Sequence, residues 1–398
     1  MNNKKSGVRI LLRVLSYVLV AVLTASVTYV ITVWNNWQGM GKLQQLEKLI
    51  DTCFIGDADK TAMEDAAADA MVAATGDRWS YYIPASSYAG YVEQMENAYV
   101  GIGVTIQQNE AGDGLKIVQM EPGGAAKAAG ILIGDEIIAV EGKTVAQEGL
   151  DGVSNLIRGE AGTKVRITVR RTAEESTQEL EFTLERKVIQ TAVAESKMLD
   201  NNIGLVTINN FNERCAQESI DAVDALIEQG AKALVFDVRF NPGGYKDELV
   251  KLLDYLLPKG DLFHSQDYTG HKETDKSDAD CLKMPMAVLV NGNSYSAAEF
   301  FAAALDEYDW AVVVGEPTVG KSHFQNTFQL SDGSAVALSI GKYFTPNGVS
   351  LAEVGGLKPE ILVEVDDETE ALIYADSLEP KEDPQLQAAI QALLEEMN

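Results

Sequence analysis

Cysteine, histidine and proline are scarce in this chain of 398 residues, which has three, three and ten of them. Cys53, Cys215 and Cys281 lie far apart and form no CxxC pattern. The sequence therefore predicts neither a disulfide framework nor a zinc site. Hydrophobic residues make up 46% and charged residues 23%. This composition excludes a disordered, collagenous or low-complexity protein and allows two or three domains.

Basic residues are also few, because 32 lysines and arginines stand against 60 acidic residues. Four of these basic residues precede the first apolar segment: Lys4, Lys5, Arg9 and Arg13. The rest of the chain has 28 basic residues. A surface so negative repels phosphates and anionic lipid headgroups, so nucleic acid is not an expected partner.

The one long run without charge covers residues 14–34, which is 21 residues. As a helix it would be roughly 32 Å long, against a hydrocarbon core of about 30 Å. The cations before it predict a cytoplasmic tail at 1–13, a single-pass anchor in the cell membrane at 14–34, and an extracytoplasmic body. A cleaved signal peptide is the alternative, although its apolar region usually has only about 7–15 residues.

Apolar and alanine residues recur at helical spacing between 39 and 75, which predicts two helices within an N-terminal helical region at 35–97. These helices form either an arm that joins two copies in a homodimer or a stalk that packs on its own body. The sequence does not separate the two.

From residue 99 short alternating strands replace the helices, and three segments resemble a PDZ domain: 99–104, 125–130 and 134–137. A glycine-bearing loop before a strand can direct successive N–H groups at a peptide's terminal carboxylate, while the strand edge pairs with the peptide. The resemblance places the domain at 98–187 and the carboxylate site at Gly101, Ile102, Gly103 and Val104. An ordinary hairpin turn is the alternative.

From residue 203 strands and helices alternate, which indicates an α/β core. The expected strands are 203–208, 233–238, 286–290 and 311–314, and the expected helices are 215–228, 247–257 and 297–305. The stretch 259–280 has few apolar residues and is expected to be a polar loop.

Gly315 to Ser322 matches the phosphate-binding pattern GxxxxGK[ST] and follows an apolar strand, which alone would predict a P-loop nucleotide hydrolase. A P-loop must open a helix, however. Here Phe324, Phe328 and Leu330 recur at period two before the turn at Asp332, which predicts a hairpin and disfavours a nucleotide site.

A different chemistry is suggested by Ser296, which stands between an apolar strand and an alanine-rich helix whose first N–H groups can stabilise negative charge. Lys321 is a candidate base for it, since Ser–Lys pairs are a known variant of nucleophile and base. The lysine pKa would have to fall from about 10.4 towards 7, which requires apolar surroundings. A helix cap is the alternative role for Ser296.

A series of motifs in order resembles the C-terminal processing peptidases, or tail-specific proteases, over about four fifths of the chain: 237–244, 294–299, 315–325 and 342–348. The resemblance implies a serine endopeptidase with an α/β protease core at 188–374 of the ClpP/crotonase-like fold, an inserted PDZ domain and a C-terminal helical segment at 375–398. It implies no cofactor and no metal. The expected substrates are extracytoplasmic proteins, cleaved near or from their C-termini after the PDZ domain recognises the free carboxylate.

The same resemblance assigns Ser296 as nucleophile, Lys321 as base and Gln325 as the residue that orients the lysine. Their even spacing would place Lys321 and Gln325 on one face of a strand. The oxyanion hole would be formed by backbone N–H groups of Gly243 or Gly244 and Ala297. Tyr295 departs from the family pattern, which has a small residue there, and would narrow the site.

Two other functions are compatible with parts of the sequence. A chymotrypsin-like Ser-His-Asp protease would have to use one of the three histidines, His264, His271 or His323, but no Gly-x-Ser-x-Gly motif surrounds a serine. A catalytically silent PDZ adaptor held at the membrane would not need Ser296, Lys321 and Gln325 together.

Overall fold

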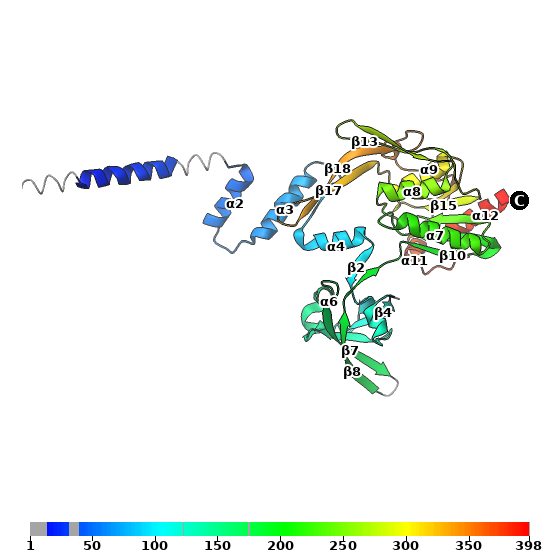
Figure 1. Cartoon of the computed structure of the whole chain (residues 1–398), viewed down its shortest axis with the longest axis horizontal. Coiled ribbons are helices and arrows are strands. Elements are labelled where there is room, and N and C mark those ends of the chain that lie inside the picture. The colour runs from blue at the N-terminus through cyan, green and yellow to red at the C-terminus, as the bar shows by residue number, and fades with distance from the viewer. Residues whose placement is uncertain (1–13, 32–39, 122, 174–175, 398) are drawn as a thin grey trace, which may run out of the picture. The chain divides into compact units, whose positions relative to one another are not determined.

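The computed structural model describes residues 14–31, 40–121, 123–173 and 176–397 (Figure 1). They belong to two compact units, Met1–Thr75 and Gly76–Asn398. The first unit contains an apolar helix at Val14–Ile31 with a mean hydropathy of 2.2, long enough to be a membrane anchor or a signal sequence. The predicted tail at 1–13 and the end of the predicted anchor, 32–34, lie outside the described residues.

The two predicted helices of the first unit are confirmed as α2 (Lys42–Cys53) and α3 (Lys60–Ala73). Lys60 at the start of α3 pairs with Glu47 of α2 at 2.8 Å. Leu43, Leu46 and Leu49 of α2 are exposed. The homodimer arm stays a prediction.

The core of the second unit is built on a six-stranded sheet, in which the residues of two central strands, β12 (Ala233–Asp237) and β15 (Met286–Val290), are all buried. Such continuous apolar runs are typical of parallel strands covered on both faces. The strand order is β10 (Ala194–Met198), β11 (Ile203–Ile208), β12, β15, β16 (Val312–Gly315), β19 (Ile361–Leu362). All neighbours are parallel except β10 and β11. The predicted α/β core is confirmed.

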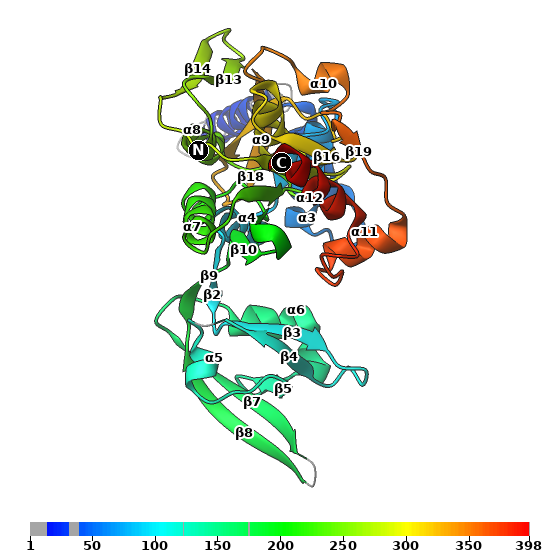
Figure 2. The same ribbon diagram turned by 90° about the vertical axis from the view of Figure 1, so that its right-hand side faces the viewer.

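Helices pack on both faces of this sheet. Phe236 and Val288 share one buried cluster with residues of α7 (Cys215–Glu228), α8 (Lys246–Leu256) and α9 (Ala297–Glu307). Val235 and Leu289, on the opposite face, pack with α12 (Pro384–Met397), which Figure 2 shows in front of the sheet.

A buried ion cluster ties the chain's end to this core. The guanidinium of Arg239 donates to Asp237, to Asp383 at 2.8 Å and to Gln385 at 3.0 Å. The C-terminal segment that contains Asp383 and Gln385 therefore packs on the α/β core rather than forming a body of its own.

The second sheet of the core corrects one expectation, because the polar stretch 259–280 is not a loop. It forms β13 (Gly260–Asp267) and β14 (Lys272–Ser277), which pair with each other, and β13 also pairs with β18 (Ala335–Phe344). Backbone hydrogen bonds to two neighbours hold β13 although its side chains are largely polar. The expected hairpin after Lys321 is confirmed as β17 (His323–Gln329) and β18, so the P-loop interpretation is wrong.

The predicted PDZ domain is inserted into this core. Strand β1 (Tyr81–Ile83) precedes the domain in sequence, yet it pairs with β18 far beyond it. The connecting strands β2 (Ala98–Gly101) and β9 (Lys187–Gln190) pair with each other. Between β1 and β2 lies α4 (Ala85–Met95), and shorter elements complete the core: η1 (Asp200–Asn202), α10 (Leu351–Val354) and α11 (Asp367–Tyr374).

The domain has a buried core of its own, which includes Ile117, Ile137, Val153 and Val169. Figure 2 shows its strands together with α6 (Val145–Ile157). The sheet order is β3 (Val104–Gln108), β4 (Leu115–Met120), β5 (Glu136–Val140), β7 (Lys164–Ala173), β8 (Ser176–Glu185), and β6 (Lys143–Thr144) pairs with β5. The short helix α5 (Ala125–Ala128) matches the second segment of the predicted PDZ pattern.

Candidate active site

Ser296 lies in a strained backbone conformation directly before α9. Its φ of 60° and ψ of −127° are rare for a residue with a side chain. The residue is buried, with 7% of its surface exposed. Its Oγ lies 2.6 Å from the hydroxyl of Tyr343. A serine at a sharp turn between a strand and a helix N-terminus is well placed to act as a nucleophile.

The carboxylate of Glu299 organises the backbone around this serine. One oxygen, Oε2, accepts the N–H groups of Ser296 at 2.9 Å and of Lys321 at 2.8 Å. The other, Oε1, accepts from Gly320 N at 2.6 Å and from Thr318 Oγ1 at 2.5 Å. Glu299 is fully buried, and this burial raises its pKa. One side chain thus brings together the segments that carry the predicted nucleophile and base.

Lys321 has a strongly perturbed amine. Burial lowers its pKa from 10.5 to about 8, although the nearby carboxylates of Asp77 and Glu299 act in the opposite direction. Its Nζ lies 4.9 Å from the centre of the Trp79 ring and 5.8 Å from that of Tyr295. These two rings stack on each other at 5.9 Å. Tyr295 therefore contributes to the lysine's surroundings as well as preceding the serine.

The structure brings the backbones of Ser296 and Lys321 together but not their reactive atoms. Among the described residues, no hydrogen bond joins Lys321 Nζ to Ser296 Oγ or to Gln325. Gln325 instead donates to the carbonyl of His323 at 3.1 Å and to Ser339 Oγ at 3.0 Å. Lys321 precedes β17, which begins at His323, so the strand alternation assumed from the even spacing does not extend from Gln325 to Lys321. A register shift, with Ile340 as the extra residue on β18, places Ser339 opposite Gln325.

Gly243 lies against the serine, because a side chain there would place its Cβ 2.7 Å from the Cβ of Ser296 and 2.8 Å from the nitrogen of Ala297. Its φ of 87° also favours glycine. Its N–H donates to Asn241 Oδ1 at 2.8 Å. The N–H groups of Gly244 and Ala297 have no acceptor within the part of the chain that the structure describes. Of the backbone N–H groups predicted to form the oxyanion hole, those of Gly244 and Ala297 are therefore free to donate to a substrate oxygen.

The histidines do not form a Ser-His-Asp site with Ser296. The ring of His264 bonds Thr274 Oγ1 and the carbonyl of Pro346, and His271 is exposed. His323 lies two residues after Lys321, and burial lowers its pKa. None of the three is hydrogen-bonded to Ser296 in the described chain.

In the PDZ domain the predicted carboxylate loop runs from the end of β2 to the start of β3. Ile102 is buried, and Gly103 has a φ of 74° with Gly124 so close that a Cβ would lie 2.5 Å from its Cα. Strand β3 has one neighbour, β4, and stands at the edge of its sheet. An edge strand preceded by such a loop can accept an additional strand.

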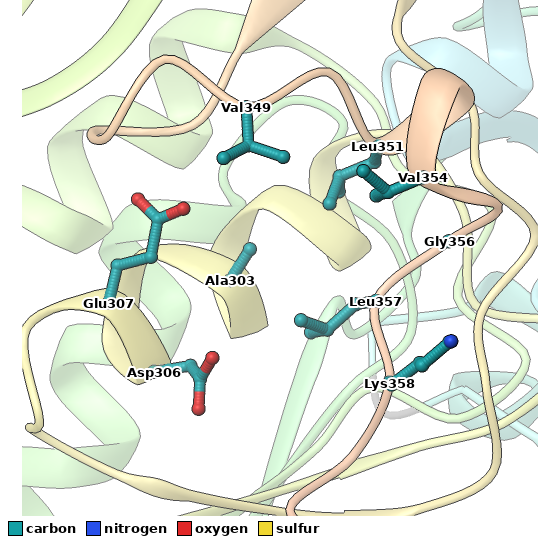
Figure 3. Close-up of a pocket in the computed structure, with 9 residues that line it drawn as sticks. All are labelled: Ala303, Asp306, Glu307, Val349, Leu351, Val354, Gly356, Leu357 and Lys358. Carbon is teal, nitrogen blue, oxygen red and sulfur yellow. The ribbon is translucent and has the colours of Figure 1, made fainter.

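A cavity of about 260 Å³ lies elsewhere in the core, between α9 and the segment 349–358 (Figure 3). Leu351, Val354 and Leu357 give it an apolar wall, and Asp306 and Glu307 stand on the α9 side. Glu307 is engaged, since it accepts from Thr345 Oγ1 and Asn347 N. The lining includes none of the predicted catalytic residues.

Glu299, Tyr343 and Trp79 are site residues to which the sequence analysis gave no role. A signal for Glu299 is readable, because Ser296 followed three residues later by Glu is the pattern of a capping box. Tyr343 lies in the motif 342–348, which carried the family resemblance, but nothing in the local sequence places its side chain beside Ser296 or that of Trp79 beside Lys321.

Comparisons with known proteins identify the family of this chain. Residues 202–363 match the model of Peptidase family S41, and residues 116–171 match that of the PDZ domain. The carboxy-terminal processing protease CtpA of Bacillus subtilis is 32% identical over 328 residues, which cover 82% of this chain and 69% of that protein. A probable CtpA-like serine protease of Staphylococcus aureus is 30% identical over 83% of this chain and 66% of its own length.

A structure of a putative protease of the same family from Bacteroides fragilis aligns with a TM-score of 0.50 at 15% identity, over 87% of this chain and 93% of that one. This alignment shows that the two chains share a fold. The chain spans about two thirds of the length of the two relatives from Bacillus and Staphylococcus. From its sequence identity to CtpA, its matched domains and its fold, the chain belongs to peptidase family S41 and is a C-terminal processing serine protease with an inserted PDZ domain.

Proposed function

We propose that this protease cleaves extracytoplasmic proteins near or from their C-termini, with Ser296 as nucleophile and Lys321 as general base. The observation that carries the proposal is the shared carboxylate oxygen of Glu299, which accepts the backbone N–H of both residues at 2.9 and 2.8 Å. The lowered pKa of Lys321, about 8, supports the role of base, because about a tenth of the amine is then neutral at pH 7, far more than in an unperturbed lysine.

In the proposed reaction, the neutral amine of Lys321 takes the proton of Ser296 as Oγ bonds to the scissile carbonyl carbon. The N–H groups of Ala297 and Gly244, which are unengaged in the described structure, donate to the oxyanion. The ammonium then protonates the leaving amine, and water releases the acyl group by the same steps. Lys321 has to leave the rings of Trp79 and Tyr295 to reach Ser296, and Gln325 is proposed to orient it there.

Selection of substrates is assigned to the PDZ domain. The Gly101–Val104 loop supplies N–H groups for a free terminal carboxylate, and the open edge of β3 pairs with the extended tail. The body of the chain is strongly acidic, which favours apolar or basic tails over acidic ones. Cleavage of internal sites without a free end would therefore be slow.

The apolar helix at Val14–Ile31 is proposed to anchor the protein in the cell membrane with the catalytic body outside. Support comes from its length and from the four cations that precede it. Retention of the helix in the mature protein distinguishes an anchor from a signal sequence.

Ser296→Ala and Lys321→Ala should each reduce peptide hydrolysis by about 10³-fold or more, because each removes a group that acts in the reaction. His264→Ala, His271→Ala and His323→Ala should retain most activity. Initial rates on an unstructured peptide with a free C-terminus measure this, with fluorophosphonate labelling of Ser296 as a second readout. Loss of activity in a folded His264 or His271 variant would overturn the assignment.

The pH dependence should follow the amine of Lys321. Below a pKa of about 8 the ammonium form dominates and cannot accept a proton, so kcat/KM should rise as pH increases and level off above that value. The profile is measured between pH 6 and 9.5, with thermal melting at each pH as a control for folding. A profile that is flat from pH 6 to 8 would contradict a lysine base.

Amidation of a substrate's C-terminus should raise KM about tenfold with little change in kcat, because it removes the carboxylate that the PDZ loop binds. Gly103→Val should weaken cleavage of the free-acid peptide in the same way, since its backbone has a positive φ and Gly124 leaves no space for a Cβ. Matched free-acid and amidated peptides are compared with both proteins. Equal rates on both peptides would eliminate carboxylate recognition.

Digestion of intact cells with an added protease should remove the body of the protein, because the proposed orientation exposes it outside the membrane. Immunoblotting of membrane fractions against the body measures this, with a cytoplasmic protein as the control for cell integrity. Protection of the body would refute the orientation, and release of a soluble mature form lacking the helix would identify a signal sequence instead.

A further inference from the structure

Tyr343 is in hydrogen-bond contact with the proposed nucleophile. Its hydroxyl lies 2.6 Å from Oγ of Ser296, and within the described chain Ser296 is its one hydrogen-bond partner. Three aromatic rings surround the phenol ring, with centroid distances of 4.6 Å for Phe300, 5.2 Å for Phe263 and 6.1 Å for Phe324. The side chain is therefore held in one place with its oxygen at the serine.

The surroundings determine which hydroxyl donates in this pair. If Ser296 donated to Tyr343, the proton of the phenol would have no acceptor among the described residues, which is unfavourable for a buried polar group. If Tyr343 donates to Ser296, the phenol proton has an acceptor, and the proton of the serine hydroxyl stays available for transfer to a base. The second arrangement satisfies the buried phenol.

The backbone of Tyr343 connects the same residue to the base. Its N–H donates to the carbonyl of Ser322 at 3.1 Å, directly after Lys321. Tyr343 lies on strand β18, which also pairs with β17. In this pairing Lys342 of β18 lies opposite His323 of β17. Tyr343 therefore holds the nucleophile with its side chain and the segment of Lys321 with its main chain.

We propose that Tyr343 is a further catalytic residue of this protease, whose hydroxyl donates a hydrogen bond to Oγ of Ser296 throughout the reaction. The inference rests on the proposed roles of Ser296 and Lys321. During acylation the Oγ–H bond breaks, its proton passes to Lys321, and Oγ bonds to the substrate carbon with the oxygen already aligned.

The hydrogen bond contributes most when the acyl-enzyme breaks down. Water attacks the ester carbon and gives a proton to Lys321, the bond from carbon to Oγ breaks, and Oγ leaves with the electron pair before it regains the proton from Lys321. Negative charge develops on Oγ in this step, and a donor binds a charged oxygen more strongly than a neutral one. The phenol thus stabilises the leaving oxygen.

Tyr343 donates its hydrogen bond without losing its proton. Complete burial raises its pKa, and the nearby carboxylate of Glu299 acts in the same direction. The phenol therefore stays neutral over the whole range in which Lys321 titrates. The rise of kcat/KM with increasing pH is therefore assigned to Lys321, whose charged neighbours are Asp77 and Glu299.

The test is Tyr343→Phe in the full-length protein, which removes one oxygen and retains the ring. We expect kcat to fall by tenfold or more without a rise in KM, the rate of fluorophosphonate labelling to fall as well, and acyl-enzyme to accumulate on an ester substrate. The rise of kcat/KM with pH should keep its midpoint near pH 8, because Lys321 is unchanged. Tyr308→Phe is the matched control, because its hydroxyl also makes one hydrogen bond, 2.9 Å to the carbonyl of Asp261, and it should keep wild-type kcat.

A Tyr343→Phe protein that melts like Tyr308→Phe and retains wild-type kcat and labelling would overturn the inference while leaving the proposed function intact. A faster variant would also overturn it, since Tyr343 would then restrain the serine. A shift of this midpoint would show that the phenol itself titrates as the base. If Ser296→Ala retains wild-type activity, the proposed function fails first and this inference fails with it.

Discussion

The buried carboxylate of Glu299 is the interaction on which the geometry of the site depends. A carboxylate removed from water is costly unless its oxygens are fully satisfied. Here two donors reach each oxygen, from Ser296, Thr318, Gly320 and Lys321. All four partners donate, so the ionised form uses every contact, whereas a proton on the carboxyl would displace one of them. The segment after β16 is thereby held against the start of α9.

The strained backbone of Ser296 is a consequence of the same contacts. Such a conformation costs on the order of 1–3 kcal/mol and persists where the surroundings determine it. The N–H of Ser296 is held by Glu299, its carbonyl accepts from Phe300 N at 3.1 Å, and Gly243 fills the space beside its Cβ. The serine is thus fixed by its neighbours on three sides, and a rigid position is what its proposed role as nucleophile requires.

Sequence patterns predicted the elements whose side chains are buried and missed those held mainly by their backbone. The strand Met286–Val290 and the helix Cys215–Glu228 were predicted with the bounds that they have, because uninterrupted apolar runs and helical spacing report burial directly. The hairpin at 260–277 was missed, since its largely polar side chains give no such signal and its strands depend on pairing with the distant β18.

In the candidate site, too, features carried by a local motif were predicted and features that depend on distant segments were missed. Ser296 and Lys321 were predicted from their motifs, and their catalytic roles stay proposals. The partners of Gln325 were not predicted, because the extra residue Ile340 on β18 changes which neighbours the amide of Gln325 meets. The position of Lys321 over Trp79 and Tyr295 joins three segments far apart in sequence. Spacing within one segment carries no information about such a contact.

The insertion of the PDZ domain sets an order for folding. Strands β1 and β18 pair across about 250 residues of sequence, and Tyr343 lies on the second of them. The inserted domain has a core of its own, so it can form while the chain is still being synthesised. The serine's surroundings remain incomplete until β18 has been made and has closed this long-range pairing. A nascent chain can therefore carry a folded PDZ domain well before β18 completes the surroundings of Ser296.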